Sequence, residues 1–156
     1  MRNFILIVLV ICSIIFSCSK DRLTDPEELG GEIALNYVEM MEELSSILSA
    51  QPDADALKPQ LADLKDKYIE IFVELGKYRS EMAPQDQSIV DSAVWSGIQE
   101  LDSGVWNIIS QAGSEYWNID MEVSNEIASF NVLTQYAFYE LLKQQMPEEA
   151  ERLGIE

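Results

Sequence analysis

The stretch LKPQLADLKDKYIEIFVELGKYRSEM, residues 57–82, decides how this chain folds. Apolar residues recur through it in alternating steps of four and three, at Leu57, Leu61, Leu64, Tyr68, Ile71, Leu75, Tyr78 and Met82. This spacing keeps one face of an α-helix apolar along its whole length. Ile69, Phe72 and Val73 widen the apolar face. The pattern therefore predicts a helix packed in a globular bundle, capped by Asp53 or Asp55 and ended by Ala83-Pro84.

Three further helices are predicted around this one. The first begins at the capping pair Asp25-Pro26 and ends at Gln51, with an apolar face made of Ile33, Tyr37, Met40, Met41, Leu44, Ile47 and Leu48. The third covers residues 84–111, with Val90, Val94, Gly97, Leu101, Val105, Ile108 and Ala112 directed inward. The fourth covers residues 121–145, with Ile127, Phe130, Leu133, Thr134, Ala137, Phe138, Leu141 and Leu142 inward, and one more turn at 148–154. Short connections favour antiparallel neighbours, so we predict an all-α, up-down-up-down four-helix bundle over residues 26–156.

The N-terminus has the layout of a secretory signal. Met1-Arg2-Asn3 precedes an apolar run from Phe4 to Phe16, which is too short to span a bilayer and is followed by Ser17 and Cys18. The segment Ile15-Phe16-Ser17-Cys18 resembles the lipobox of bacterial lipoproteins, although a residue smaller than Phe16 is usual there. The resemblance implies cleavage of residues 1–17, acylation of Cys18 and a lipidated tether over residues 18–25. An uncleaved membrane anchor and cleavage without lipid are the alternatives.

The lipobox resemblance implies a place in the cell. The chain is expected in a bacterial envelope, anchored by lipid to a membrane, with the outer membrane favoured and the periplasmic and surface faces both open. Ser19-Lys20-Asp21 is similar to the export tags that send lipoproteins to the surface in some Bacteroidetes-like bacteria. Cys12 leaves with the signal, so the remaining single cysteine cannot form an internal disulfide.

Composition restricts the possible functions. The 28 acidic and 10 basic residues give a formal charge of −18, which disfavours binding to nucleic acids and to anionic lipid surfaces. The charge favours cationic partners, although acids that merely coat solvated helix faces would give the same count. The chain has no histidine, which removes the usual general base, histidine-dependent catalytic pairs and most zinc sites. We expect a non-enzymatic protein without a cofactor or metal.

Two patterns in the sequence partly match metal sites. Met40 or Met41 and the turn at residues 51–57 loosely resemble cytochrome b562-like bundles, in which a methionine and a late histidine ligate haem; this chain lacks the histidine. The acidic segments at residues 53–55 and 118–122 begin like calcium loops but lack the glycine and the glutamate that such loops require. We interpret the methionines as core residues and both acidic segments as helix caps.

Aromatic residues supply the candidate contact sites. Trp95 and Trp106 are eleven residues apart and could wall a groove on the third helix, although the small residues around them also favour close helix packing. Tyr116 and Trp117 are expected in a connection, either as exposed anchors between acids or as a plug for the open end of the bundle. Tyr136 and Tyr139 are expected on the outer face of the fourth helix.

The function expected from these features is non-covalent binding. The leading hypothesis is an acidic, lipid-anchored envelope protein that binds a protein partner, with a cationic protein as one option. The alternative is an acidic inhibitor or immunity-type protein that neutralises a cationic enzyme or toxin. A carrier of a small ligand or metal within the bundle is the third class.

Overall fold

The computed structural model describes residues 22–155, and this part of the chain contains helices and no strand. The prediction of an all-α fold is confirmed. In order, the elements are η1 (Arg22–Thr24), α2 (Pro26–Ser49), α3 (Ala54–Ser80), α4 (Pro84–Ile98), α5 (Ser103–Trp117), α6 (Met121–Ser129), η2 (Phe130–Ala137), α7 (Tyr139–Gln145) and α8 (Pro147–Arg152). The predicted signal peptide, Cys18 and residues 19–21 lie outside the described residues.

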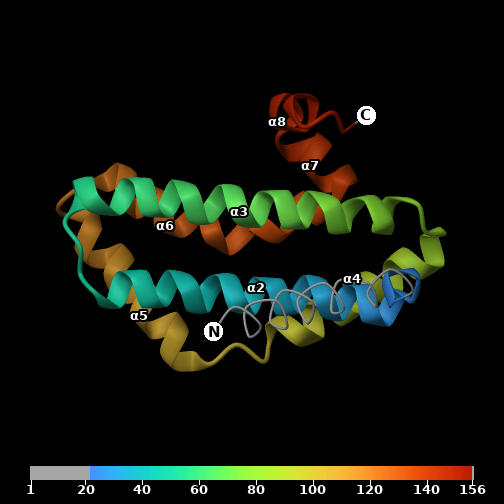
Figure 1. Ribbon diagram of the computed structural model, residues 1–156, viewed down its shortest axis with the longest axis horizontal. Helices are drawn as coiled ribbons and strands as arrows, with labels where there is room; N and C mark the ends of the chain where they lie inside the picture. Colours follow the sequence, from blue (N-terminus) through green and yellow to red (C-terminus); the bar gives the residue numbers. More distant parts are fainter. Residues whose placement is uncertain (1–21, 156) are drawn as a thin grey trace, which may run out of the picture.

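The long helices α2 and α3 form a hairpin on which the other elements pack (Figure 1). Helix α4 lies along α2, α6 and η2 lie along α3, and α5 crosses near the α2–α3 turn (Figure 1). Helices α7 and α8 stand at the opposite end, on the far side of α3 (Figure 1). Within residues 22–155 no helix is both long and apolar enough to cross a membrane.

The first two helices begin where the sequence predicts. The Asp25 carboxylate accepts hydrogen bonds from the backbone N–H of Glu27 at 2.9 Å and of Glu28 at 3.1 Å. The Asp53 carboxylate accepts one from the N–H of Ala56 at 2.9 Å. These bonds satisfy backbone donors that have no partner inside a helix, which stabilises each start by about 1 kcal/mol. Asp53 is therefore a helix cap, as the sequence indicates.

The apolar faces of α2 and α3 form most of the core. On α2, Ile33, Tyr37, Met40, Met41, Leu44 and Leu48 are buried. On α3, Leu57, Leu61, Leu64, Tyr68, Ile69, Phe72 and Leu75 are buried. Complete burial of one such side chain contributes roughly 1.5–3 kcal/mol. The interpretation of Met40 and Met41 as core residues is confirmed, since neither is exposed.

Small residues let α2 and α4 approach closely. A Cβ atom placed on Gly30 would lie 2.5 Å from the Ala93 Cβ and 2.6 Å from the Val90 carbonyl oxygen. A Cβ atom placed on Gly97 would lie 2.5 Å from the Ala34 Cβ. Neither position has room for a side chain, so the close-packing interpretation is confirmed for Ala93 and Gly97. Ser92, Ser96 and Ser103 are exposed.

The prediction of one continuous third helix over residues 84–111 is wrong. The chain forms two helices, α4 and α5, separated by Gln99–Asp102, and α5 continues past Gly113 and Ser114 to Trp117. Asp102 has extended backbone angles, and its carboxylate accepts a hydrogen bond from the Gly104 N–H at 2.7 Å. This local bond starts a new helix and competes with continuation of the old one. The new register buries Ile109 and leaves Ile108 39% exposed, so the predicted stripe is wrong at Ile108. It is confirmed at Val90, Val94, Leu101 and Ala112, which are buried.

The prediction of one continuous fourth helix over residues 121–145 is also wrong. Asp120 caps α6 as predicted, but the chain then tightens into the 3₁₀ helix η2 and restarts as α7 after Phe138. The buried residues Ile127, Phe130, Leu133 and Tyr136 are three apart, which suits the three residues per turn of a 3₁₀ helix. At the end of η2 the backbone passes close to Gly76 of α3, where an added Cβ would lie 3.0 Å from the Ala137 Cα.

The C-terminal helices are fixed to the hairpin by Arg79. Its guanidinium donates to both Asp91 carboxylate oxygens, at 2.8 and 3.1 Å, and lies 4.7 Å from the centre of the Phe138 ring. The predicted extra turn at residues 148–154 is present as α8, with Ala150 and Ile155 buried beside it. One buried cation therefore joins α3, α4 and the start of α7.

Candidate binding site

Helices α5 and α6 form a hairpin with an open cleft along one side. The Ser124 hydroxyl on α6 donates a hydrogen bond to the Gly113 carbonyl on α5 at 2.8 Å. A Cβ added to Gly113 would lie 4.0 Å from the nearest Ile127 carbon, so the two helices are close there without a clash. The cleft has a volume of about 420 Å³, and we call it the α5–α6 cleft.

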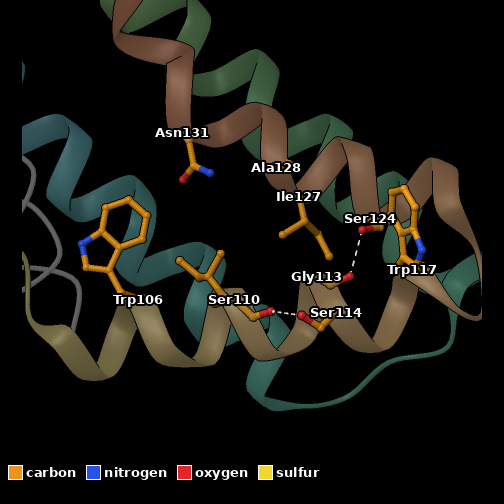
Figure 2. Close-up of a pocket in the computed structure, with 10 residues that line it drawn as sticks. Trp106, Ser110, Gly113, Ser114, Trp117, Ser124, Ile127, Ala128 and Asn131 are labelled. Carbon is orange, nitrogen blue, oxygen red and sulfur yellow. Dashed lines mark hydrogen bonds between the residues drawn. The ribbon is translucent and has the colours of Figure 1, made fainter.

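Two tryptophans lie at the ends of this cleft, and its buried lining residues are Ile109, Ser124 and Ile127. From α5 it is lined by Trp106, Ile109, Ser110, Gly113, Ser114 and Trp117. The other wall consists of Ser124, Ile127, Ala128 and Asn131. Figure 2 shows the two indoles at opposite ends of the cleft and the Asn131 amide directed from η2 toward α5. All ten lining residues are uncharged.

The cleft corrects the predicted groove between Trp95 and Trp106. Trp95 belongs to α4, is 66% exposed and does not line the cleft, because the break at Asp102 places it on a different helix from Trp106. Trp106 and Trp117 instead share the eleven-residue spacing, this time within one helix. Eleven residues complete about three turns, so both indoles lie on one face of α5, about 16 Å apart along its axis.

Tyr116 and Trp117 have opposite environments. Both belong to the last turn of α5 and not to a connection. Tyr116 is buried, and its hydroxyl donates to the Pro52 carbonyl, so it plugs the end of the bundle near the α2–α3 turn. Trp117 is 58% exposed, as an anchor would be. The plug alternative is thus confirmed for Tyr116, and Trp117 has the exposure that the anchor alternative requires.

The turn between α5 and α6 presents an apolar surface. Trp117, Ile119 and Met121 are 58%, 72% and 56% exposed, and we call these three residues the turn patch. The backbone beneath the patch is ordered by hydrogen bonds from the Ile119 and Asp120 N–H groups to the Tyr116 carbonyl, at 3.0 and 2.7 Å. The patch is therefore exposed on a backbone whose local conformation is fixed.

The acids predicted to flank this patch are mostly paired. The Lys58 ammonium group lies 2.8 Å from the Asp120 carboxylate and 3.2 Å from that of Glu122. The hydrogen bond from Lys58 holds the pKa of Asp120 below its usual value, aided by the capping bonds from Val123 and Glu122. Asp120 is thus a helix cap, as interpreted for residues 118–122, and also an ion-pair partner.

The prediction that Tyr136 and Tyr139 form an outer contact face is wrong for Tyr136 and weak for Tyr139. Tyr136 is buried, and its hydroxyl donates to Glu149 at 3.2 Å; burial, together with this carboxylate, raises the pKa of Tyr136 to about 12. Tyr139 is half-buried, and its hydroxyl donates to the Val73 carbonyl at 2.6 Å. Both tyrosines fix the C-terminal segment to the bundle.

Acidic groups do not gather into a metal site in the part of the chain that the structure describes. Within residues 22–155 no three carboxylate or cysteine side chains are placed to hold one ion. The candidate site therefore consists of the turn patch and the α5–α6 cleft, which share Trp117.

Sequence reasoning missed the cleft because it treated residues 84–111 as one helix. Two signals could have revealed it. Asp102-Ser103-Gly104 is a helix start, and residues 103–114 contain no charged residue although 24% of the chain is charged. Comparisons with protein-family models, with curated proteins and with solved structures found no match for this chain.

Proposed function

We propose that this chain is a lipid-anchored, non-enzymatic protein of a bacterial envelope that binds another protein through the turn patch. In this proposal the helices keep the up-down-up-down order of a four-helix bundle, with α4 and α5 together as the third segment and α6 through α7 as the fourth. Cys18 carries the lipid, and the helical domain presents the patch to its partner.

The exposure of Trp117, Ile119 and Met121 carries this proposal. Three large apolar side chains that are more than half exposed within five residues are unusual on a surface rich in charge. Aromatic and aliphatic anchors of this kind supply most of the binding energy at protein interfaces. The hydrogen-bonded turn beneath them reduces the entropy lost on binding.

Electrostatics indicates the character of the partner. The formal charge of −18 attracts a positively charged protein and accelerates its encounter with the chain. Lys58 pairs with Asp120 and Glu122 beside the patch, so the contact itself is mainly apolar. We therefore propose a partner with a net positive charge and an apolar contact surface.

The anchor places this binding at a membrane. Attachment of the chain by a lipid on Cys18 would raise its effective concentration near other envelope components. In cells fed a clickable fatty acid, the wild-type chain should be labelled and Cys18→Ala should not. Cys12→Ala is the matched control and should be labelled like the wild type. Labelling of Cys18→Ala would refute the proposed anchor without bearing on the turn patch.

The patch has its own test. The chain should retain its partner when it is purified from the membranes of its native host, and Ile119→Ser combined with Met121→Ser should reduce recovery of that partner by at least about tenfold. Leu35→Ser is the control, because Leu35 is 51% exposed on α2, away from the patch. Equal recovery with all three chains would contradict the proposal.

One observation favours the inhibitor or immunity-type function as a second candidate. Asp63, Asp66, Glu70 and Glu74 are all exposed and recur at steps of three and four, so they lie on one face of α3, which we call the acidic stripe. Lys67 and Lys77 share this face, and Lys67 pairs with Glu43 of α2. A stripe of this kind complements the basic surface of a cationic enzyme or toxin. Salt should slow the encounter of a cationic partner with this chain in both cases, so the two functions differ in the affinity that remains at high salt. Binding through the stripe should then be lost, whereas apolar binding through the turn patch should remain.

A further inference from the structure

We propose that the α5–α6 cleft binds a neutral oligosaccharide. This site is separate from the protein contact proposed for the turn patch, although Trp117 borders both. The cleft volume of about 420 Å³ lies within the range of small-molecule sites, roughly 300–1,000 Å³. Its ten lining residues combine two indole rings with hydroxyl and amide groups and no charge.

The absence of charge from the cleft lining excludes ionic ligands. A buried cation would find no carboxylate among the ten lining residues, and a buried anion would find no lysine or arginine there. An anion would also be repelled by the excess of acids over the whole chain. The preferred ligand therefore has no net charge.

Polar groups in the cleft exclude a purely apolar ligand. Asn131 supplies an amide that can both donate and accept hydrogen bonds, and it is exposed and directed across the cleft (Figure 2). Ser110 adds a hydroxyl group, and the Ser114 hydroxyl, which donates to the Ser110 carbonyl at 3.0 Å, can still accept a hydrogen bond. A hydrocarbon covering these groups would remove their water and provide no hydrogen bond in return. The ligand must therefore have hydroxyl or amide groups of its own.

The tryptophans indicate the shape of the ligand. Trp106 is 36% exposed and Trp117 is 58% exposed, and their separation of about 16 Å along α5 leaves room for more than one ring between them. The electron-rich face of an indole attracts C–H groups, which carry a partial positive charge. A pyranose ring presents C–H groups on its faces and hydroxyls around its edge. An oligosaccharide can therefore stack on the indoles while its hydroxyls bind Asn131 and the serines.

A glycan array that carries both neutral and acidic oligosaccharides tests this proposal. The full chain, purified in a mild detergent, should be retained by neutral glycans and not by acidic ones. The glycan retained most strongly is then titrated against the chain by calorimetry. Retention on no glycan, or a preference for acidic glycans, would overturn the proposal. A second copy of the chain is the alternative occupant, so a dimer that Trp106→Ala dissociates would also overturn it.

Substitutions locate the binding in the cleft. Trp106→Ala should weaken binding of the selected glycan about tenfold, the loss expected for one stacked aromatic contact. Asn131→Asp keeps the size of the side chain and removes the amide donor, so it should weaken binding about fivefold or more without affecting folding. Trp95→Ala is the matched control and should bind like the wild type, because Trp95 lies outside the cleft. Unchanged affinity in both Trp106→Ala and Asn131→Asp would refute the site.

A third variant separates the two proposed sites. Ile119→Ser should reduce recovery of the protein partner and leave glycan affinity unchanged, because Ile119 does not line the cleft. Failure of the protein contact would therefore not imply failure of the glycan site. If Ile119→Ser lost as much glycan affinity as Trp106→Ala, this result would contradict binding of the glycan within the cleft.

Discussion

Substitution of Gly30 by alanine should destabilise the fold, while the same change at Gly31 should stabilise it. Alanine favours a helix by about 1 kcal/mol over glycine, and both positions belong to α2. At Gly31 an added Cβ meets nothing within 4 Å, so the full gain of about 1 kcal/mol is expected. At Gly30 the new methyl group would lie 2.6 Å from the Val90 carbonyl oxygen and 2.5 Å from the Ala93 Cβ.

The expected size of the effect at Gly30 follows from these contacts. Overpacking costs about 1–3 kcal/mol, and a contact with backbone lies at the upper end because a backbone atom cannot rotate away. After the helix gain is subtracted, Gly30→Ala should lower the free energy of unfolding by about 1–2 kcal/mol. The difference between the two variants should therefore be about 2–3 kcal/mol.

Urea unfolding of the full chain in a mild detergent, followed by circular dichroism, measures both values. The reasoning would be refuted if Gly30→Ala were as stable as Gly31→Ala. A second pair tests the same contact by rescue. Gly97→Ala should destabilise, because its Cβ would lie 2.5 Å from the Ala34 Cβ, and Ala34→Gly in the same chain should restore most of the stability. Additive losses in this double variant would show that the α2–α4 contact is not the cause.

Two other substitutions examine the interior of the fold. Arg79→Met should lower the free energy of unfolding by about 2 kcal/mol, because the bonds to Asp91 and the contact with Phe138 are lost. Lys77→Met is the control and should change this free energy little, because Lys77 is exposed. Equal losses for the two variants in urea unfolding would contradict this role of Arg79. Burial raises the pKa of Tyr37 from its ordinary 10.0 to about 12. As the pH rises, the unfolded chain therefore loses this proton before the folded chain does, and the free energy of unfolding should fall between pH 10 and 12. Over that pH range the free energy of unfolding of Tyr37→Phe should fall by up to about 2 kcal/mol less than that of the wild type. Identical pH profiles of stability for the two chains would show that the buried Tyr37 hydroxyl is not the cause.

Local sequence predicted the parts of the fold that local chemistry controls. The carboxylates of Asp25, Asp53 and Asp120 cap α2, α3 and α6 because each needs only the next few backbone N–H groups. The buried faces of α2 and α3 could be predicted from the spacing of their apolar residues, because each helix buries one continuous face.

Helix breaks escaped prediction for two different reasons. At Asp102 the apolar period continues across the break, so periodicity alone gives no sign of it, and only the capping residue does. At η2 the relevant contacts are distant in sequence: Gly76 of α3 admits the backbone of Ala137 and the ring of Tyr139, where η2 ends and α7 begins. Local periodicity carries no record of such contacts.

The candidate site could not be predicted because the break at Asp102 was not predicted. Because α5 starts again at Asp102, Trp106 and Trp117 come to one face and Trp95 is left on another helix. The exposure of Trp117 and the burial of Tyr116 follow from the same turn of α5, whose last residues pack toward Pro52 on one side only. Neighbouring aromatics in a sequence cannot be assigned to core or surface until the helix that carries them is known.

Site-specific photo-crosslinking in native membranes gives the sharpest test of a protein contact at the turn patch. A photoreactive phenylalanine analogue at position 119 should form one specific adduct with another protein. The same analogue at position 35, which is 51% exposed on α2, should form none. Equal adducts at the two positions, or none at position 119, would contradict binding through the turn patch.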